Sequence, residues 1–252
     1  MRNVRLIAKL DIKAPNLVKT IQLEGLRKIG NPNEFAIRYY QNGIDEIIYN
    51  DVVASLYDRN NIFDIIKETV KNVFIPITVG GGLRSSKDVE MALKNGADKI
   101  FINSAAIKNK NLIKEIAQNF GSQCLVINIQ CKKNSDFYEA YYDSGRERSF
   151  KNAVDWATEV QDLGAGEILI TSIDKEGTSN GFDIELIQKL NEVIKIPVIF
   201  SGDMGNQNHF EELIKKSSPD GVCMSNVLHY NKVDLKNLRD LIIKYDMSTR
   251  IE

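Results

Sequence analysis

Short apolar runs separated by longer amphipathic segments recur along the whole chain. The runs are rich in β-branched residues and are too short for buried helices, so they predict buried strands, while the segments between them have the apolar spacing of helices. Strands that alternate with helices favour a parallel sheet with crossover helices. The expected strands are residues 4–10 (VRLIAKL), 45–50 (DEIIYN), 75–79 (IPITV), 99–103 (KIFIN), 124–129 (CLVINI), 167–173 (EILITSI), 196–200 (IPVIF) and 221–225 (GVCMS).

Two of the expected helices have clear boundary residues. In residues 85–99, the apolar spacing predicts a helix that Ser86 caps and Gly96 ends. Residues 108–121 repeat this design, with Gly121 as the stop. No Pro-, Gly- or Ser-rich linker divides the chain, so we expect one domain that covers residues 1–252.

The two halves of the chain resemble each other at an offset of about 120 residues, which indicates a duplicated unit of four strand–helix pairs. Such a duplication predicts a closed (β/α)8 barrel built from two similar half-barrels. A doubly wound sheet with independent halves is the alternative, although the chain has no dinucleotide-binding glycine pattern. The matching segments are residues 43–50 with 164–171, 78–84 with 199–205, and 99–105 with 221–227.

Composition narrows the function classes. A net charge of −1 over 252 residues, with no basic stripe or tail, argues against nucleic acid or a membrane surface as a partner. The N-terminal segment has too short an apolar run for a signal peptide, and no stretch approaches the length of a membrane span. Cys124, Cys131 and Cys223 lack metal-ligand spacing. We therefore expect a reduced cytoplasmic protein with free thiols, no bound metal and no cofactor.

In a barrel of this type the residues just after each strand form the active face. Two adjacent expected strands end in glycines and small polar residues, which suit an anionic or phosphorylated small molecule because they expose backbone N–H groups. These residues are Gly81, Gly82, Asn103 and Ser104. The second half offers a weaker copy in Gly177, Gly202 and Ser225, where Asp203 stands in place of a glycine and would repel a phosphate.

Side-chain alternation along the strands predicts which charged residues point into the barrel. Near the N-terminal ends this set comprises two cations and two anions, and a mutually paired ring is the arrangement that keeps buried charges satisfied. The set is Arg5, Glu46, Lys99 and Glu167. The same parity places Lys9, Asn50 and Asn128 in the middle of the lumen, either along a path for a small polar molecule or in an internal polar network.

The first strands of the two halves differ at their ends. Residues 6–13 (LIAKLDIK) end with Asp11 aimed at the mouth, whereas residues 125–132 (LVINIQCK) place Gln130 at the matching position. A glutamine side chain cannot take up or release a proton near neutral pH, so a reaction that needs two carboxylates would be disabled. Asp11 and Gln130 are the candidate catalytic positions.

The chain resembles the HisF-like family, the cyclase subunit of imidazole glycerol phosphate synthase, over nearly its whole length. The resemblance rests on residues 10–32 (LDIKAPNLVKTIQLEGLRKIGNP), 78–82 (TVGGG), 96–106 (GADKIFINSAA), 164–178 (GAGEILITSIDKEGT) and 201–205 (SGDMG). It implies a barrel that takes ammonia from a glutaminase docked on its N-terminal face and passes it through a charged gate to a bisphosphorylated substrate. By position it implies these roles: Arg5, Glu46, Lys99 and Glu167 as gate, Asp98 as glutaminase contact, Asp11 as catalytic acid, Lys19 in a mobile loop, and Gly82, Asn103 and Ser104 as phosphate site.

The departures from that family lie at the chemistry end. Gln130 stands where the family has an aspartate, Glu176 replaces an aspartate, and Asp203 replaces a glycine. This pattern, with residues 50–61 (NDVVASLYDRNN), resembles a paralogous subfamily linked to acetamidino modification of surface-polysaccharide and nonulosonic acid sugars. The leading hypothesis is therefore an ammonia-channelling barrel with a glutaminase and an ATP-dependent sugar amidotransferase as partners. The alternatives are a cyclase of histidine biosynthesis and, less consistent with a single acid, a sugar-phosphate isomerase.

Three further features have less specific interpretations. Residues 132–149 are long and aromatic-rich for a loop, which predicts a small hairpin over the mouth, either a partner surface or a lid. His209 and His229 lack a second histidine or a carboxylate at catalytic spacing and are interpreted as structural. Trp156 lies on an amphipathic helix and is interpreted as packing.

Overall fold

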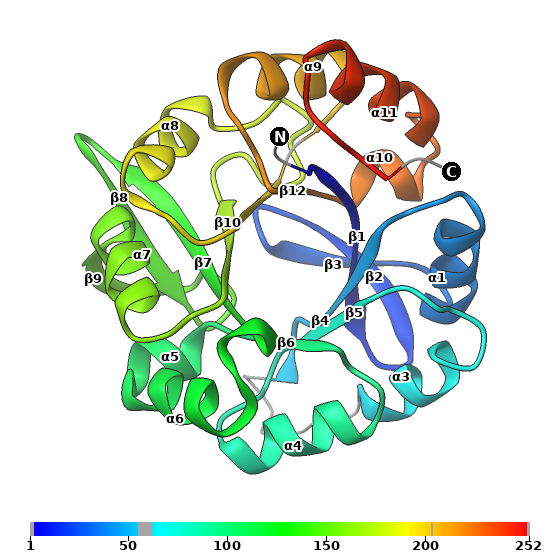
Figure 1. Ribbon diagram of the computed structural model, residues 1–252. Coiled ribbons are helices and arrows are strands. Elements are labelled where there is room, and N and C mark those ends of the chain that lie inside the picture. Colours follow the sequence, from blue (N-terminus) through cyan, green and yellow to red (C-terminus); the bar gives the residue numbers. More distant parts are fainter. Residues whose placement is uncertain (1–2, 55–61, 203, 251–252) are drawn as a thin grey trace.

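The computed structural model describes residues 3–54, 62–202 and 204–250. Within these residues, eight parallel strands form a closed ring around one axis, as the alternating pattern predicts (Figure 1). The ring closes because the first strand pairs with both its successor and the last strand of the chain. The barrel strands are β1 (Arg5–Lys13), β4 (Glu46–Asp51), β5 (Ile77–Gly80), β6 (Lys99–Ile102), β7 (Leu125–Asn134), β10 (Glu167–Ser172), β11 (Val198–Ser201) and β12 (Gly221–Met224).

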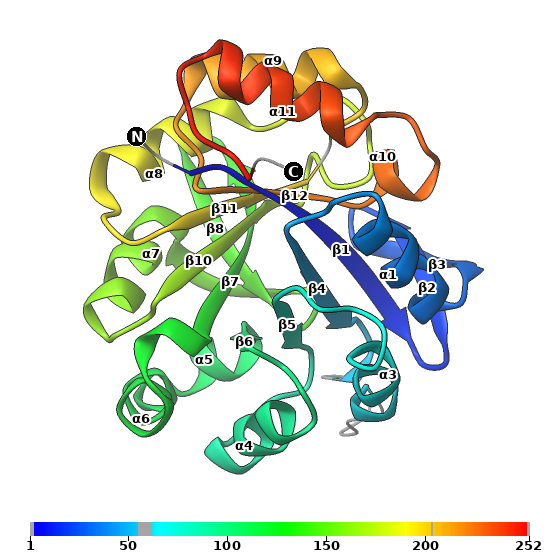
Figure 2. The same ribbon diagram turned by 45° about the vertical axis from the view of Figure 1, so that its right-hand side comes forward.

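Helices surround the barrel on its outside (Figures 1 and 2). The fold is a (β/α)8 barrel, and the doubly wound sheet with independent halves is wrong because β6 pairs with β7 and β12 pairs with β1, which joins the two halves on both sides. The helices are α1 (Pro32–Gln41), α3 (Phe63–Thr69), α4 (Ser86–Lys94), α5 (Ser104–Lys108), α6 (Asn111–Phe120), the 3₁₀ turn η1 (Ser122–Cys124), α7 (Ala153–Asp162), α8 (Ile184–Val193), α9 (Gln207–Lys216), α10 (Asn226–His229) and α11 (Leu235–Lys244).

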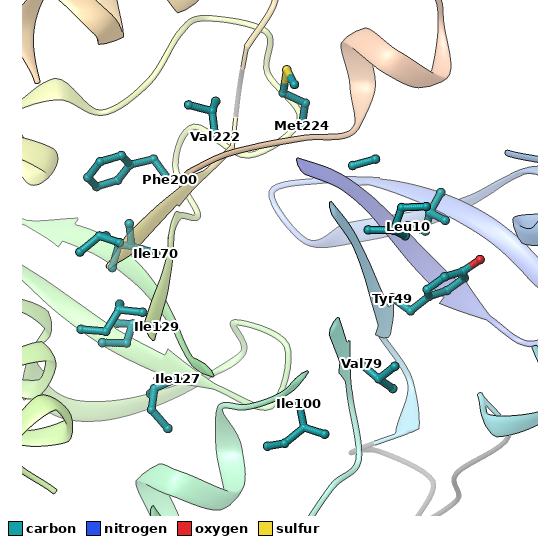
Figure 3. Close-up of a cluster of buried hydrophobic side chains, with 14 of the residues drawn as sticks. Leu10, Tyr49, Val79, Ile100, Ile127, Ile129, Ile170, Phe200, Val222 and Met224 are labelled. Carbon is teal, nitrogen blue, oxygen red and sulfur yellow. The ribbon is translucent and has the colours of Figure 1, made fainter. Parts of the chain in front are cut away.

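The main hydrophobic core fills the space between the barrel and its helices. Figure 3 shows side chains such as Leu10, Tyr49 and Ile100 pointing from the strands away from the barrel axis. Trp156 on α7 is 2% exposed and belongs to this layer, which supports its interpretation as a packing residue. Because successive side chains on a strand face opposite ways, the residues between these outward ones point into the lumen and form the site described below.

The first strand of each half continues beyond the barrel into an antiparallel excursion. After β7 the chain forms β8 (Phe137–Tyr142) and β9 (Glu147–Asn152), so the hairpin expected in residues 132–149 is confirmed. After β1 the chain forms β2 (Asn16–Ile21) and β3 (Glu24–Gly30), and β2 pairs with both β1 and β3. The sequence interpretation treated this second excursion as a loop, but it is a hairpin that matches the one in the other half.

Helix boundaries follow the expected signals with one shift. Ser85, not Ser86, caps α4, because its side chain accepts the Asp88 N–H, while the Ser86 hydroxyl bonds Glu115 on α6. Gly96 follows the end of α4 with a φ of +105°, and Gly121 ends α6 with a φ of +88°, both conformations that favour glycine. The stops predicted from glycine are therefore confirmed.

Three aspartates bind the N-terminal ends of the strands to one another. Asp45, Asp98 and Asp220 each precede a strand and accept the backbone N–H of a residue in a neighbouring strand segment, at 2.8, 2.8 and 3.0 Å. Asp98 is the exposed member of the three. The repetition gives Asp98 a structural role in the barrel, and its glutaminase contact stays a prediction.

Candidate functional site

Four charged side chains form a closed ring of ion pairs at the N-terminal end of the lumen. Arg5 donates to Glu46 at 2.8 Å and also to Glu167. Lys99 Nζ lies 3.1 Å from Glu46 Oε1 and 3.0 Å from Glu167 Oε2. Each cation thus contacts both anions, the arrangement that strand parity predicts.

The ring is neutral and closely held. Glu46 is 1% exposed and accepts a further hydrogen bond from Thr78 Oγ1 at 2.7 Å, whereas the Arg5 and Lys99 side chains keep 23% and 21% exposure. The two cations offset the hydration that the carboxylates lose on burial. A molecule that enters the lumen from this end must pass between these four side chains. Their role as a gate stays a prediction.

An apolar layer that sequence reasoning missed lies above the ring in the lumen. Seven side chains, each from a different barrel strand, form a cluster separate from the main core, and each is 3% exposed or less. In this layer β5 contributes Gly80, since a Cβ there would lie 2.4 Å from the ring atoms of Phe101. The cluster comprises Ile7, Ile48, Phe101, Val126, Leu169, Ile199 and Cys223. The lumen is thus packed at mid-height. The sequence does indicate this layer, because an apolar residue lies two positions before each of Lys9, Asn50 and Asn128 and so points to the same face of its strand.

The polar lumen residues lie toward the C-terminal ends of the strands rather than at mid-height. Asn50 Nδ2 donates to Asp11 Oδ1 at 2.8 Å, and Lys9 Nζ lies 3.5 Å from the same oxygen. Burial on its own would lower the pKa of Lys9, but the carboxylates of Asp11 and Glu176 outweigh it and raise that pKa above its ordinary value. Lys9 is therefore a permanent cation beside Asp11.

A cavity of about 240 Å³ opens at the mouth in the first half of the barrel. It brings together most of the residues expected there, including Gly81 and Gly82, and adds the cationic Arg84 and Lys108, which sequence reasoning missed. Asn50, Asn128 and Gln130 line its inner wall. Asn128 Oδ1 and Gln130 Oε1 are buried and have no hydrogen-bond partner among the described residues.

Asn103 and Ser104 are at this cavity, but their side chains hold the hairpin of β8 and β9. Asn103 Nδ2 donates to the carbonyls of Asn128 and Tyr141 at 2.9 and 3.1 Å, and Ser104 Oγ accepts the Asp143 N–H at 2.9 Å. Anion binding here would therefore rest on the backbone and on Arg84 and Lys108, of which Lys108 already pairs with Asp143 at 2.8 Å on the same cavity. The phosphate-binding role of Gly81, Gly82, Asn103 and Ser104 stays a prediction.

In the second half, the matching residues line a narrow cavity, and Gly177 also lines a neighbouring cavity of about 680 Å³ together with residues of β2 and β3. Gly177, Gly202 and Ser225 line a cavity of about 10 Å³ together with Lys19 and Glu176. Lys19 Nζ lies 2.6 Å from Glu176 Oε1, and both side chains are buried. Burial alone would raise the pKa of Glu176, but Lys19 and Lys9 lower it to about 2. Asp203, expected to disturb this site, lies outside the described residues.

His229 lies against this second half, as part of an aromatic cluster. Its Nδ1 lies 2.6 Å from the Tyr39 hydroxyl, and its ring stacks on Tyr39. Burial, aided by the charges of Lys19 and Arg38, lowers the pKa of His229 to about 3, so the ring is neutral in the folded protein. His209 accepts the Gly205 N–H at 3.1 Å. These contacts support the structural interpretation of both histidines.

The buried neutral His229 predicts a pH dependence of stability. Because its folded pKa lies below its unfolded value of about 6.5, the unfolded chain binds more protons below pH 6.5 and is favoured as the pH falls. We expect the difference in unfolding free energy between wild type and His229→Asn to shrink by roughly 1 kcal/mol per pH unit from pH 6.5 to 4.5. Glu176 titrates below this window. Urea unfolding at several pH values would measure the difference, and equal slopes for the two proteins would contradict the prediction.

The described residues hold no group of three or more His, Cys, Asp or Glu side chains that could bind a metal ion. Over the same residues, no helix combines the length and apolarity needed to cross a bilayer. All three cysteines are unpaired and buried, and burial raises the pKa of the Cys131 thiol well above its ordinary value.

Comparison with known proteins gives one consistent family. Residues 5–234 match the family model described as histidine biosynthesis protein. A protein of Legionella pneumophila named imidazole glycerol phosphate synthase subunit HisF is 56% identical over 211 residues, 83% of this chain and 100% of the relative. Proteins of the same name from Thermococcus onnurineus and Pyrococcus furiosus are each 41% identical, and both alignments cover 98% of either chain.

Proposed function

Because the chain belongs to the HisF-like family of histidine biosynthesis proteins, we propose that it is the barrel subunit of a glutamine-dependent synthase. A glutaminase docks on the N-terminal face, where Asp98 is exposed, and releases ammonia into the lumen. The ammonia passes the ring of Arg5, Glu46, Lys99 and Glu167, crosses the packed apolar layer above it when those side chains move apart, and leaves at the mouth beside Asp11 and Gln130. The chain works without a cofactor.

The closed ring of ion pairs is the observation that carries this proposal. Four charges gathered inside a barrel are costly unless paired, and packed apolar residues would stabilise the same space at least as well. The ring lies at the N-terminal end of the barrel, whereas Asp11 lies at the opposite end, at the mouth. When its side chains separate, a neutral ring admits a small neutral molecule such as ammonia and disfavours a free ion, which gives the charges a use at this position.

Two finer functions follow from different observations. The names of the relatives favour the cyclase of histidine biosynthesis, in which Asp11 would be the acid–base group. Gln130 favours the acetamidino hypothesis, because a two-carboxylate cyclase would lack one acid. In that hypothesis the barrel transfers ammonia to an ATP-dependent sugar amidotransferase. The names weigh more for the family reaction, so the cyclase is the function to test first.

A cyclase assay with free ammonium and the bisphosphorylated ribosyl aminoimidazole carboxamide substrate decides between the two. If the chain is a cyclase, wild type turns the substrate over, and Gln130→Asp raises kcat by about tenfold or more because general acid–base catalysis contributes factors of this size. If it relays ammonia, wild type shows no turnover but still stimulates a co-purified glutaminase.

A matched variant separates the effect of a second acid at the mouth from the effect of an added negative charge. Gln123 lies on the surface in η1 at the opposite end of β7, so Gln123→Asp adds the same charge far from the mouth. Gln123→Asp should leave turnover at the wild-type value. Turnover that rises equally in both variants would show that the added charge, and not a second acid at the mouth, is responsible.

A further inference from the structure

Three cavities at the mouth share lining residues and so form a row along the hairpin of β2 and β3. The cavity of about 240 Å³ shares Asn50, Gln130 and Ser144 with a cavity of about 60 Å³. This small cavity in turn shares Thr20 and Gly25 with the cavity of about 680 Å³. The row passes Gln130, a candidate catalytic position, and suits an elongated ligand whose two ends lie in the outer cavities.

The cavity of about 680 Å³, called the hairpin cavity below, lies between the hairpin and the end of α10. Its volume is usual for a small-molecule site, which has about 300 to 1,000 Å³. Among the described residues its lining includes three cations, Lys19, Arg27 and Lys232, and one carboxylate, Glu24. Glu176 offsets Lys19, with which it pairs, so one positive charge remains in excess. The hairpin cavity therefore favours an anionic group.

The strand pairing of the hairpin places Arg27 on this cavity. Lys19 of β2 and Arg27 of β3 are opposite each other, so their side chains lie on the same face of the hairpin. Lys19 pairs with Glu176 at 2.6 Å, whereas Arg27 is exposed and has no ion pair among the described residues. The planar guanidinium of Arg27 is therefore available to an incoming anion and can bind two oxygens of one phosphate.

A second cation and a buried hydroxyl complete the lining. Lys232 is exposed in the turn after α10, where its Nζ lies 5.9 Å from the centroid of the Tyr230 ring, and no carboxylate of the described residues pairs with it. Thr20 is 2% exposed, and its Oγ1 has no hydrogen-bond partner in the part of the chain that the structure describes. A buried hydroxyl without a partner is costly, so a ligand oxygen that accepts from it is favoured. Two cations and a hydroxyl donor suit a phosphate group.

From these observations we infer that the hairpin cavity binds one phosphate of a substrate that carries a phosphate at each end, with Arg27 and Lys232 as the residues that determine this specificity. The other phosphate then lies in the cavity of about 240 Å³. This arrangement leaves the Lys19–Glu176 ion pair in place. The inference rests on the proposed function, because the cyclase reaction names the bisphosphorylated ligand. It moves the second phosphate from the glycines of the second half to the hairpin.

Calorimetric titration of the barrel with the bisphosphorylated ribosyl aminoimidazole carboxamide substrate, without ammonium or glutamine, tests the inference. Arg27→Met and Lys232→Met each remove a cation from the hairpin cavity and should weaken binding about tenfold or more. Lys28→Met is the matched control, because Lys28 is the next exposed cation of β3, is opposite Val18 and does not line the cavity. Its affinity should stay within about twofold of wild type, since a surface charge away from the ligand is screened.

Ribulose 5-phosphate separates a phosphate contact from general attraction of anions. It carries one phosphate and should occupy the cavity of about 240 Å³, so Arg27→Met should change its affinity by about twofold or less. Equal losses for ribulose 5-phosphate and the bisphosphate would overturn the inference. Equal bisphosphate affinities of Arg27→Met and Lys28→Met would also overturn it, as would failure of the wild type to bind the bisphosphate. Urea unfolding checks that each variant is folded.

The titration is independent of ammonia transfer, because it uses neither glutamine nor a glutaminase. A chain that binds the bisphosphate through Arg27 but does not stimulate a glutaminase would refute the proposed function alone. A chain that stimulates a glutaminase and binds the bisphosphate equally well with and without Arg27 would overturn the inference alone.

Discussion

Replacing Glu46 by glutamine will lower the free energy of unfolding by about 3 kcal/mol, because the change leaves Arg5 and Lys99 facing one carboxylate instead of two. Glu46 is the most connected member of the ring, with ion pairs to both cations and a hydrogen bond from Thr78. The loss falls at the lower end of the range for buried pairs because about a fifth of each cationic side chain is exposed. Urea unfolding measures the change.

Two controls isolate the ring from the charge itself. Glu68 pairs with Lys71 at 2.6 Å on the surface, where both side chains are more than half exposed, so Glu68→Gln should change stability by about 0.5 kcal/mol or less. The double variant Glu46→Gln with Lys99→Met restores neutrality and should recover part of the loss. A Glu46→Gln protein as stable as Glu68→Gln would show that the ring contributes nothing to stability.

The Glu46→Gln variant also reports on ammonia transfer. With a glutaminase bound, an unbalanced ring holds a net positive charge at the inlet, and its side chains no longer pair in a neutral set. We therefore expect glutamine-dependent activity of the complex to fall more than activity with free ammonium. Equal losses with both nitrogen sources would mean that the ring matters for the fold and not for the passage of ammonia.

Much of the fold and of the ring was predictable because both depend on short-range rules. Strand and helix alternation sets the barrel, and the two-residue period of a strand decides that Arg5, Lys9 and Asp11 share one face. Ion pairing then follows from charge alone, since buried cations and anions must meet. These predictions did not require the register between neighbouring strands.

The register between neighbouring strands determines the depth of each side chain in the lumen, which could not be predicted from the sequence. Ile7, not Arg5, is opposite Glu46, so neighbouring strands are staggered and residues at equal depth are not at equal positions from the strand start. This stagger, together with the Phe101 ring that lies across Gly80, produces the apolar layer between the ring and Lys9. The parity argument assigned faces correctly but could not order the layers.

The contacts made by the hairpins could not be predicted from the sequence either. Lys19 and Glu176 are separated by 157 positions, and they meet only because the chain after β1 folds back as a hairpin over the second half. The resemblance placed Lys19 in a mobile loop, with no partner. Residues 16–21 do carry a strand signal in the sequence, a short run in which Leu17 and Val18 stand beside Lys19 and Thr20 and β-branched residues are frequent. These four residues are buried in the structure.

Replacing Gly81 by alanine will cost about 4 kcal/mol of stability and close the cavity at the mouth. Gly81 has a φ of +95°, and a Cβ there would lie 2.2 Å from the carbonyl oxygen and 2.8 Å from the amide nitrogen of Asp51. These are backbone atoms of β4, so neither can rotate away as a side chain could. Relief requires moving β4 or the glycine turn, and Asn50 and Gly82 on the same cavity would move with them.

Gly25 supplies the matched control, because it separates backbone strain from the clash. It also has a positive φ, +68°, but a Cβ there would meet nothing within 4 Å. Gly25→Ala should therefore cost about 1 kcal/mol, the conformational penalty alone. Urea unfolding of both variants, with titration of ribulose 5-phosphate, measures the two effects. If both variants lose the same stability, the approach of β4 to the glycine turn is not what requires Gly81. If Gly81→Ala binds the probe as wild type does, the cavity does not depend on that turn.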